Sequence, residues 1–372
     1  MSSSEKECKN RMIRKAISVF LLLLLPACFA ETFLVTSDLH LTVNRVNHEA
    51  TLEALTKAQC DALILLGDST NNAHIEEHNH VLEYLESLES PESLEAPAYI
   101  IPGNHDVTLD RSFFPAKYHA YGWDQAFAKD AASASYAVMT RDICFLMLDT
   151  NDVSGGYVAS LGGISSETCD WIDSTLRALP EGVMTVACGH HPILPIEREK
   201  RTPGAARLAD TLRGNGVKLY LCGHDHCFAA AKVDGLQQIT VGQAQAYPGW
   251  AGTLEVTPEG IHWHVVELYD AATKQMMKSA TIEMGRRMAQ GTLAGTVYKD
   301  DKECIDWFVE TFEKWLSSEL NPKMCSEMLK APAANKWRQV ETQTVVKDWM
   351  FGLLENCPQD FRDIYIHRDQ TL

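Results

Sequence analysis

Gly223-His224-Asp225-His226 is the stretch around which this chain is organised, because four polar runs upstream follow the same kind of segment. Each run comes directly after a short apolar segment that has the character of a buried strand. The upstream runs, in chain order, are Asp38-Leu39-His40, Gly67-Asp68-Ser69-Thr70-Asn71, Gly103-Asn104-His105-Asp106 and Gly189-His190-His191-Pro192. Strands of an open α/β sheet present their carboxyl ends at one edge, where ligands bind. The five runs therefore predict one crevice that holds metal ions, and the number of donors favours two.

The side chains in these runs are those that transition-metal sites use. Residues i and i+2 of a strand point to the same face, so Asp38 and His40 are expected to bind one ion together. His224 and His226 offer two further imidazoles, and Asp68 can bridge two cations through its two carboxylate oxygens. A single histidine is usually structural, but five polar runs after five strands favour a shared site. Mixed carboxylate, imidazole and amide donors suit iron, manganese or zinc better than calcium or magnesium.

Length and charge restrict the classes of protein that remain. The 372 residues suffice for one large core and a smaller addition. The formal net charge of −17 argues against a long nucleic acid or an anionic membrane surface as partner, since both are bound by basic faces. A small phosphate ester remains compatible, because metal ions would bind it locally.

Residues 1–30 have the pattern of a secretory signal. The basic residues Lys9, Arg11, Arg14 and Lys15 precede the apolar run Ala16–Leu25, which is shorter than the roughly 20 residues of a membrane span. Small residues then lead to Ala30. Two outcomes stay open, cleavage after Ala30 or lipid attachment at Cys28. Either predicts an exported protein that is extracytoplasmic, secreted or anchored to a membrane as a lipoprotein.

Strands and helices are expected to alternate over residues 31–269. Helices are predicted over Asn47–Gln59, His74–Ser90, from Ser165 to Leu179 and over Ala206–Arg213. A hairpin is predicted from Tyr136–Thr140 and Ile143–Asp149, and a β meander from Cys227–Val233, Gln237–Val241, Gly252–Val256 and Ile261–Leu268. The combination favours an α/β fold of two sheets packed face to face, with helices outside.

Residues 270–372 are predicted to form a small C-terminal helical bundle. Apolar stripes at helical spacing run through Glu303–Leu320 and Asn335–Glu355. Such stripes are usually core, so the bundle is expected to pack on the first domain, on a partner copy in a homo-oligomer, or on both.

Several other residues have two interpretations. Cys144, Cys188 and Cys222 are expected to pack in the core, and Cys304, Cys325 and Cys357 could form one disulfide whose pairing stays open. The histidines His74, His78 and His80 are expected on a solvated helix face. Tyr118, Tyr121 and Trp123 are expected in a packed core, and Asn151–Gly163, with Tyr157, in a mobile loop near the site.

The order Asp-x-His, Gly-Asp-x-x-Asn, Gly-Asn-His-Asp, Gly-His-His-Pro and Gly-His-x-His closely resembles the calcineurin-like metallophosphoesterase superfamily, over about residues 33–267. The resemblance implies a four-layer αββα sandwich with two divalent or mixed-valence metal ions. Within the superfamily, Gly67–Asn72, the exported N-terminus and the helical C-terminal addition look most like bacterial cyclic-nucleotide phosphodiesterases.

The resemblance also implies a role for each motif residue. The first metal would be held by Asp38, His40, Asp68 and His226, and the second by Asp68, Asn104, His190 and His224. His105 would stand beside the phosphate without binding metal, and Asp106 could orient it. Asn71 and His191 are expected to contact the ligands rather than the metals, and Asp225 to form the turn.

The expected function is the hydrolysis of small phosphate esters, most simply 3′,5′-cyclic nucleotides or similar phosphodiesters. In this mechanism a hydroxide shared by the two metals attacks phosphorus, and His105 protonates the leaving alkoxide. A broad-specificity phosphatase or nucleotidase is the alternative within the same class. A non-catalytic metal-binding scaffold is the alternative of another class.

Overall fold

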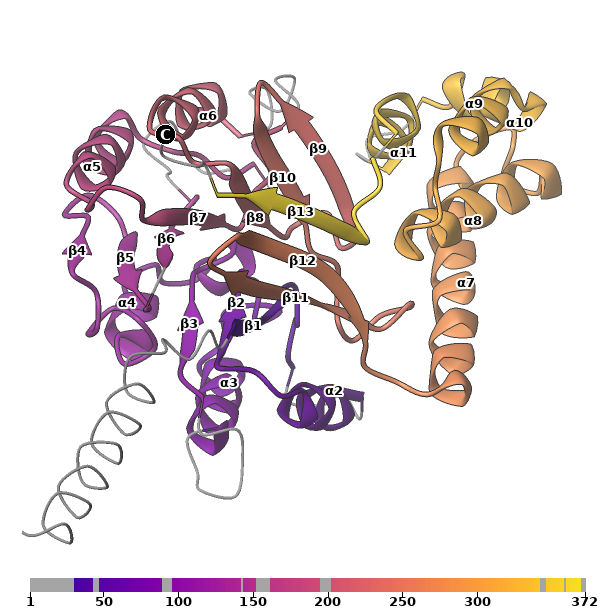
Figure 1. Cartoon of the computed structure of the whole chain (residues 1–372). Coiled ribbons are helices and arrows are strands. Elements are labelled where there is room, and N and C mark those ends of the chain that lie inside the picture. Colours follow the sequence, from indigo (N-terminus) through magenta and orange to yellow (C-terminus); the bar gives the residue numbers. More distant parts are fainter. Residues whose placement is uncertain are drawn as a thin grey trace, which may run out of the picture.

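Two β-sheets packed face to face form the centre of the chain in its computed structural model (Figure 1). The structure describes residues 30–42, 47–88, 96–141, 143–151, 161–194, 202–341, 346–357 and 359–368. The six-stranded sheet has the order β13-β12-β11-β1-β2-β3, with β1 (Glu31–Thr36), β2 (Ala62–Leu65), β3 (Ala98–Ile100), β11 (Trp250–Thr257), β12 (Gly260–Glu267) and β13 (Asp363–His367). The seven-stranded sheet has the order β4-β5-β6-β7-β8-β10-β9, with β4 (Ala128–Lys129), β5 (Tyr136–Met139), β6 (Ile143–Leu148), β7 (Met184–Gly189), β8 (Leu219–Cys222), β9 (Ala229–Val233) and β10 (Leu236–Thr240).

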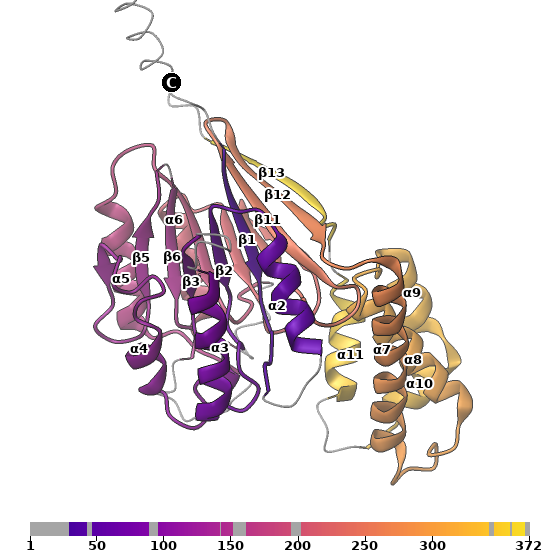
Figure 2. The same cartoon turned by 90° about the horizontal axis from the view of Figure 1, so that it is seen from below.

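Helices cover the outer faces of both sheets and form a group at one end of the molecule (Figures 1 and 2). Those of the sandwich are α2 (Asn47–Lys57), α3 (Ile75–Leu88), α4 (Phe113–Tyr118), α5 (Ser166–Arg177) and α6 (Ala205–Gly214). Those of the C-terminal group are α7 (Ala271–Leu293), α8 (Lys302–Leu316), α9 (Pro322–Lys330), α10 (Pro332–Arg338) and α11 (Val346–Glu355).

The layers follow from the alternation of side chains along the strands. Leu34 of β1 faces outward and belongs to one buried cluster with Leu85 of α3. Its neighbour Phe33 faces inward, where its ring lies 4.7 Å from that of Phe145 in β6 of the other sheet. The helices α5 and α6 cover the outer face of the seven-stranded sheet in the same way. The predicted four-layer αββα sandwich is confirmed.

Parallel pairing brings the polar runs to one edge. In the first sheet β1, β2 and β3 run parallel, and in the second sheet β6, β7, β8 and β10 do. Each of the five predicted strands is present, and each polar run leaves its carboxyl end. The loops that carry the candidate ligands therefore converge where the two sheets meet.

The predicted β meander is wrong in its pairing. The strands β9 and β10 stay in the seven-stranded sheet, whereas β11 pairs antiparallel with β1 and begins the extension of the other sheet. The strand β10 joins the free edge of β8, and β11 joins the free edge of β1, so the four strands are divided between the two sheets. Strand periodicity reports burial on one face and does not report which edge a strand joins.

The C-terminal region differs from its prediction in two places. The single helix predicted over Asn335–Glu355 is wrong, because α10 ends at Arg338 and α11 begins at Val346. Two helices on one core produce the same apolar stripe as one long helix. The strand β13 was also missed, although its alternating sequence pairs antiparallel with β12 and joins the six-stranded sheet.

The C-terminal helices dock on the segment that directly follows His226. The indole nitrogen of Trp315, near the end of α8, donates to Cys227 Sγ at 2.7 Å. The amide nitrogen of Phe228 donates to Ser318 Oγ at 2.9 Å. Cys227 belongs to the buried core of the helical group rather than to that of the sandwich. The helical addition therefore supports a loop of the candidate site.

Two of the predictions concern residues outside the described ranges. They are the signal, of which only Ala30 is described, and the loop Asn151–Gly163, most of which, with Tyr157, is not described. No helix of the described ranges is long and apolar enough to cross a membrane.

The described cysteines are all thiols, including the three C-terminal candidates for a disulfide. The three strand cysteines are buried in the core, as predicted.

The histidines after Asp68 are not all solvated. His74 is exposed, but His78 is buried, with its Nδ1 3.0 Å from Tyr118 Oη and its ring against Phe113. Burial lowers the pKa of His78 to about 4. The helical spacing of α3 turns this position inward, where Tyr118 and Tyr121 form the predicted packed core.

Mild acid is expected to destabilise the protein through His78. The unfolded state binds the proton with a pKa of about 6.5 and the folded state with a pKa of about 4, so stability falls as the pH decreases between these values. Between pH 7.5 and pH 5.0 the free energy of unfolding should decrease by about 2 kcal/mol more in the wild type than in His78→Gln. Urea unfolding at both pH values measures this difference, and equal losses in the two proteins would contradict the assignment.

Candidate metal centre

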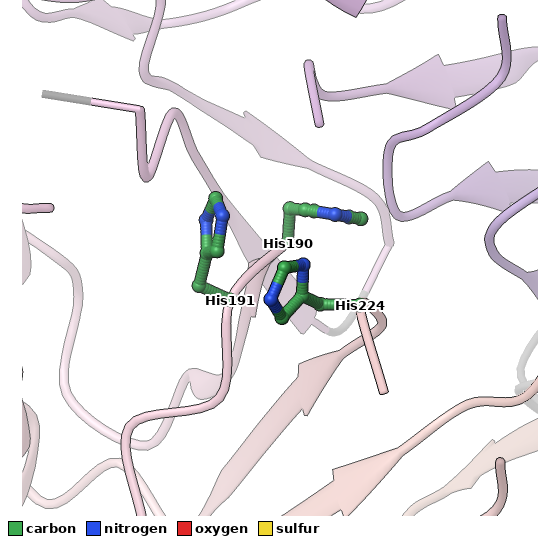
Figure 3. A group of neighbouring side chains, drawn as sticks. All are labelled: His190, His191 and His224. Atoms are coloured by element: carbon green, nitrogen blue, oxygen red, sulfur yellow. The ribbon is translucent and has the colours of Figure 1, made fainter. Parts of the chain in front are cut away.

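The ligands predicted from the five polar runs lie in two adjacent groups. In the first, Asp38, His40, Asp68 and His226 each offer a ligand atom, and these atoms lie within 4.8 Å of one another. In the second, His190, His191 and His224 each offer a ligand atom within the same limit, so His191, which was predicted to contact the ligands rather than a metal, lies among the candidate donors. Figure 3 shows the second group, with its three rings carried by the loops after β7 and β8. The loops thus bring together side chains that are far apart in sequence.

Asp68 lies at the junction of the two groups. Its Oδ2 is 3.2 Å from His190 Nε2 and 3.8 Å from His40 Nε2, so one oxygen faces an imidazole of each group. Its other oxygen, Oδ1, accepts a hydrogen bond from the amide nitrogen of His105 at 2.8 Å. The side chain is 1% exposed. This is the position that a bridging carboxylate requires.

Ring nitrogens of the first group point to a common place. His40 Nε2 lies 3.1 Å from His226 Nε2, and Asp38 Oδ1 lies 3.4 Å from the same nitrogen of His226. Gln243 Nε2 is 2.8 Å from His226 Nδ1, where it can donate only if that nitrogen carries no proton. Asp38 also accepts from the amide nitrogen of His224 at 3.0 Å, which joins the loops after β1 and β8.

The second group contains buried ring nitrogens that a cation could bind. His190 Nδ1 lies 2.8 Å from the carbonyl oxygen of Leu66 and donates to it, so the lone pair is at Nε2. Nε2 of His190 is buried and faces Asp68 Oδ2 at 3.2 Å, whereas Nε2 of His191 is buried and has no hydrogen-bond partner among the described residues. Asn104 Oδ1 lies 3.2 Å from His224 Nδ1, beside the same group. A cation would satisfy these lone pairs, so the residues present fit a metal ion.

The buried carboxylates of the two ligand groups are stabilised by a positive charge placed beside them. Burial by itself would lower the pKa of His190, but the Asp68 carboxylate outweighs it and raises that pKa to about 9. Burial lowers the pKa of His40 to about 3, so this ring is neutral and can act as a ligand. A proton on His190 and a divalent cation are alternative ways to balance the buried carboxylates. Metal binding should therefore release the proton.

The loops hold the ligands in an uncommon backbone conformation. Five of the eight non-glycine residues with positive φ in the described chain belong to the polar runs, namely Asp38, His40, Asp68, His224 and His226. Such strain concentrates at functional sites, where the surrounding structure enforces it. The expectation that Asp38 and His40 share a face of one strand is wrong, since β1 ends at Thr36. The left-handed turn brings them together instead.

Two glycines of the polar runs permit close approach between loops. A Cβ atom on Gly103 would lie 2.2 Å from Asp68 Oδ1, and one on Gly223 would lie 1.9 Å from Ser37 Oγ. Either contact is far inside van der Waals range. Glycine stands at these positions because the next loop occupies the space of a side chain.

Asp106 acts on the backbone rather than on the His105 ring. Its carboxylate is fully buried and accepts from the amide nitrogens of Thr70 at 2.8 Å and Gly103 at 2.9 Å. His105 Nδ1 lies 2.6 Å from the carbonyl oxygen of Asn71, to which it donates. Asp106, predicted to orient His105, reaches it through Thr70, whose Oγ1 lies 3.0 Å from Asp106 Oδ1 and 3.2 Å from the carbonyl oxygen of His105. The carbonyl oxygen of Asn71 orients the His105 ring, and a motif of side chains could not reveal this main-chain contact.

Two positioning residues were missed. Thr150 Oγ1 is 2.8 Å from His191 Nδ1 and accepts from the amide nitrogens of His190 and His191. Gln243 contacts His226, as described above. Both stand shortly after a strand, β6 or β10, so the rule that found the other runs would have found these as well.

An αββα sandwich with buried carboxylates and imidazoles at the carboxyl ends of its strands defines a metal-binding hydrolase fold. The chain belongs to the calcineurin-like phosphoesterase family, whose sequence profile matches residues 31–228. The family is metal-dependent, in agreement with the donor set found here.

Relatives with assigned activities are distant. A probable glycerophosphodiester phosphodiesterase (GpdQ) of Arcobacter nitrofigilis is 28% identical over 46% of this chain and 58% of its own. Tartrate-resistant acid phosphatase type 5 of Rattus norvegicus is 27% identical over 35% of this chain and 43% of its own. The chain thus spans about half the length of these relatives. A dimetal phosphatase from Danio rerio has the same fold, with a TM-score of 0.54 at 15% identity over 64% of this chain and 97% of that one.

Gly103→Ala should weaken metal binding. The added Cβ would lie 2.2 Å from Asp68 Oδ1 and 2.3 Å from the Asp68 backbone nitrogen, so both must shift, and loss of such positioning typically costs 10- to 100-fold in metal affinity. Equilibrium dialysis against Mn²⁺ measures the change. The matched control is Gly214→Ala in α6, where an added Cβ meets no atom within 4 Å. Equal affinities in the two variants would contradict the close packing of Gly103 on Asp68.

Proposed function

We propose that the chain is a metal-dependent phosphoesterase that hydrolyses small phosphodiesters. The main support is that one buried carboxylate, that of Asp68, lies beside imidazoles of both ligand groups. Family membership and the presence of a phosphodiesterase and a phosphatase among the relatives support the same reaction class.

The charges of the site suit an anionic substrate once cations are bound. Asp38 and Asp68 contribute two negative charges, whereas the imidazoles and Asn104 contribute none when neutral. Two divalent cations would therefore leave the site net positive within a chain of formal charge −17. When bound, such ions polarise a phosphoryl oxygen and lower the pKa of water. Asp68, His190 and His40 would hold them, with the other ligands of the two groups.

His105 has the position of a proton donor to the leaving group. Its ring is partly exposed and lies 4.7 Å from the His40 ring in an edge-on arrangement. Because Nδ1 donates to Asn71, the ring is fixed and the exchangeable proton is at Nε2. In the charged form, Nε2–H can donate to the leaving alkoxide oxygen, which becomes an alcohol.

The substrate class is tested by comparing three kinds of ester with Mn²⁺ present. We expect turnover of bis(p-nitrophenyl) phosphate and of a natural small diester, either 3′,5′-cyclic AMP or a glycerophosphodiester. Turnover should stop with a chelator and return with added metal. Turnover of p-nitrophenyl phosphate alone would favour the phosphatase alternative. Metal binding without turnover of any ester would favour the scaffold.

Two substitutions separate chemistry from metal binding. His105→Ala should keep its metal content and lose about 10²- to 10⁴-fold in kcat on the natural diester, as expected for a general acid. Asp68→Asn should lose metal as well as activity, because the carboxylate serves both groups. Metal analysis and steady-state kinetics of both variants measure this. If His105→Ala retains wild-type kcat on a diester with a poor leaving group, the role as acid is excluded.

A further inference from the structure

A second cluster of imidazoles and a carboxylate lies in the six-stranded sheet, outside the metal centre. Glu255 in β11 and His262 and His264 in β12 each offer a ligand atom, and these atoms lie within 4.8 Å of one another. Glu255 pairs with Thr32, near the start of β1, whereas the metal centre lies beyond its end. The cluster is therefore at the opposite end of that strand.

Strand geometry places the three side chains together. Glu255 is the direct cross-strand partner of His262, and His264 is two residues further along the same face. Trp263, between the histidines, points to the opposite side and is fully buried in the core between the sheets. The cluster thus occupies the outer face, where all three residues are partly exposed. A ligand can reach it from solvent without rearrangement of the fold.

The spacing of the first pair already suits a metal ion. His262 Nδ1 lies 3.5 Å from Glu255 Oε2. Tetrahedral zinc, with ligand distances of about 2.0–2.1 Å, separates its ligand atoms by about 3.4 Å. The rings of His262 and His264 have centroids 5.1 Å apart, so a small side-chain rotation would bring the third nitrogen into place.

Asp363 of β13 fixes the orientation of His262. Its Oδ1 lies 3.1 Å from His262 Nε2, which donates to it. In the neutral ring the lone pair is then at Nδ1 and faces the Glu255 carboxylate. Two acceptors at this distance repel unless a proton or another cation lies between them. A carboxylate behind the far nitrogen of the ring is also the usual support of a metal-binding histidine.

His264 distinguishes a metal ion from a simple proton. Its Nδ1 is shielded from solvent and has no hydrogen-bond partner among the described residues. A proton on His262 would form an ion pair with Glu255 and leave that nitrogen unpartnered. A cation that His264 bound through this nitrogen would remove both the repulsion and the unpartnered atom.

We propose that Glu255, His262 and His264 bind a d-block dication such as Zn²⁺, with Asp363 as the positioning residue. Two neutral imidazoles and one carboxylate form a donor set that zinc accepts, and water completes the coordination. The second carboxylate, on Asp363, balances the remaining charge. The site would connect β11 with β12 and, through Asp363, with the C-terminal strand β13.

Zinc stoichiometry tests this proposal. The full chain is dialysed against Zn²⁺ and the bound metal is counted. His264→Ala should bind one equivalent less than the wild type, and Glu255→Gln should show at least tenfold weaker binding of that equivalent. The matched control is His119→Ala, because His119 is an exposed histidine 2.7 Å from the Asp124 carboxylate. It should bind as many equivalents as the wild type.

Circular dichroism verifies the fold of each variant, and Glu255→Gln decides by itself if His264→Ala does not fold. Equal zinc stoichiometry and affinity in wild type, His264→Ala and Glu255→Gln would overturn the proposal. The readout does not depend on hydrolysis, so it is independent of the proposed function.

Discussion

The buried carboxylate of Asp68 is the constraint on which the rest of the site depends. A charge without solvent is costly unless hydrogen bonds and opposite charges surround it. Here the amide nitrogen of His105 contacts one oxygen, and imidazoles of His190 and His40 face the other. These partners come from three different loops, so the carboxylate can be satisfied only when all three are in place. Gly103 allows its loop to approach that closely.

The strands provide the rigidity that this arrangement requires. Each left-handed non-glycine residue costs about 1–2 kcal/mol, and several of them are ligands. The loops keep this conformation because each begins at the carboxyl end of a strand that is buried in the sandwich. The Asp106 carboxylate adds a further constraint, since it holds the backbone of Thr70 and Gly103 in a fixed relation. A rigid sandwich thereby positions a strained set of ligands.

The parts of the chain beyond the family profile are connected to the same sheets. The helical group contacts Cys227 and Phe228, the two residues that follow His226. The chain then returns to the six-stranded sheet as β13, where Asp363 contacts His262. The C-terminal region is therefore built onto the sandwich at two places, one beside the metal centre and one beside the second cluster.

The sequence by itself determined the layers of the fold and the ligand types, because apolar runs closed by polar turns report buried strands locally. It could not determine what each buried polar group contacts. The partner of Asp106, the main-chain role of Asn71 and the inward position of His78 all depend on loops distant in sequence. The strand β13 was missed within a region predicted as helical, because its five residues form a strand only where they pair with the edge of β12. Tertiary structure decided these points because hydrogen bonds and burial are satisfied between segments, whereas periodicity is a property of one segment.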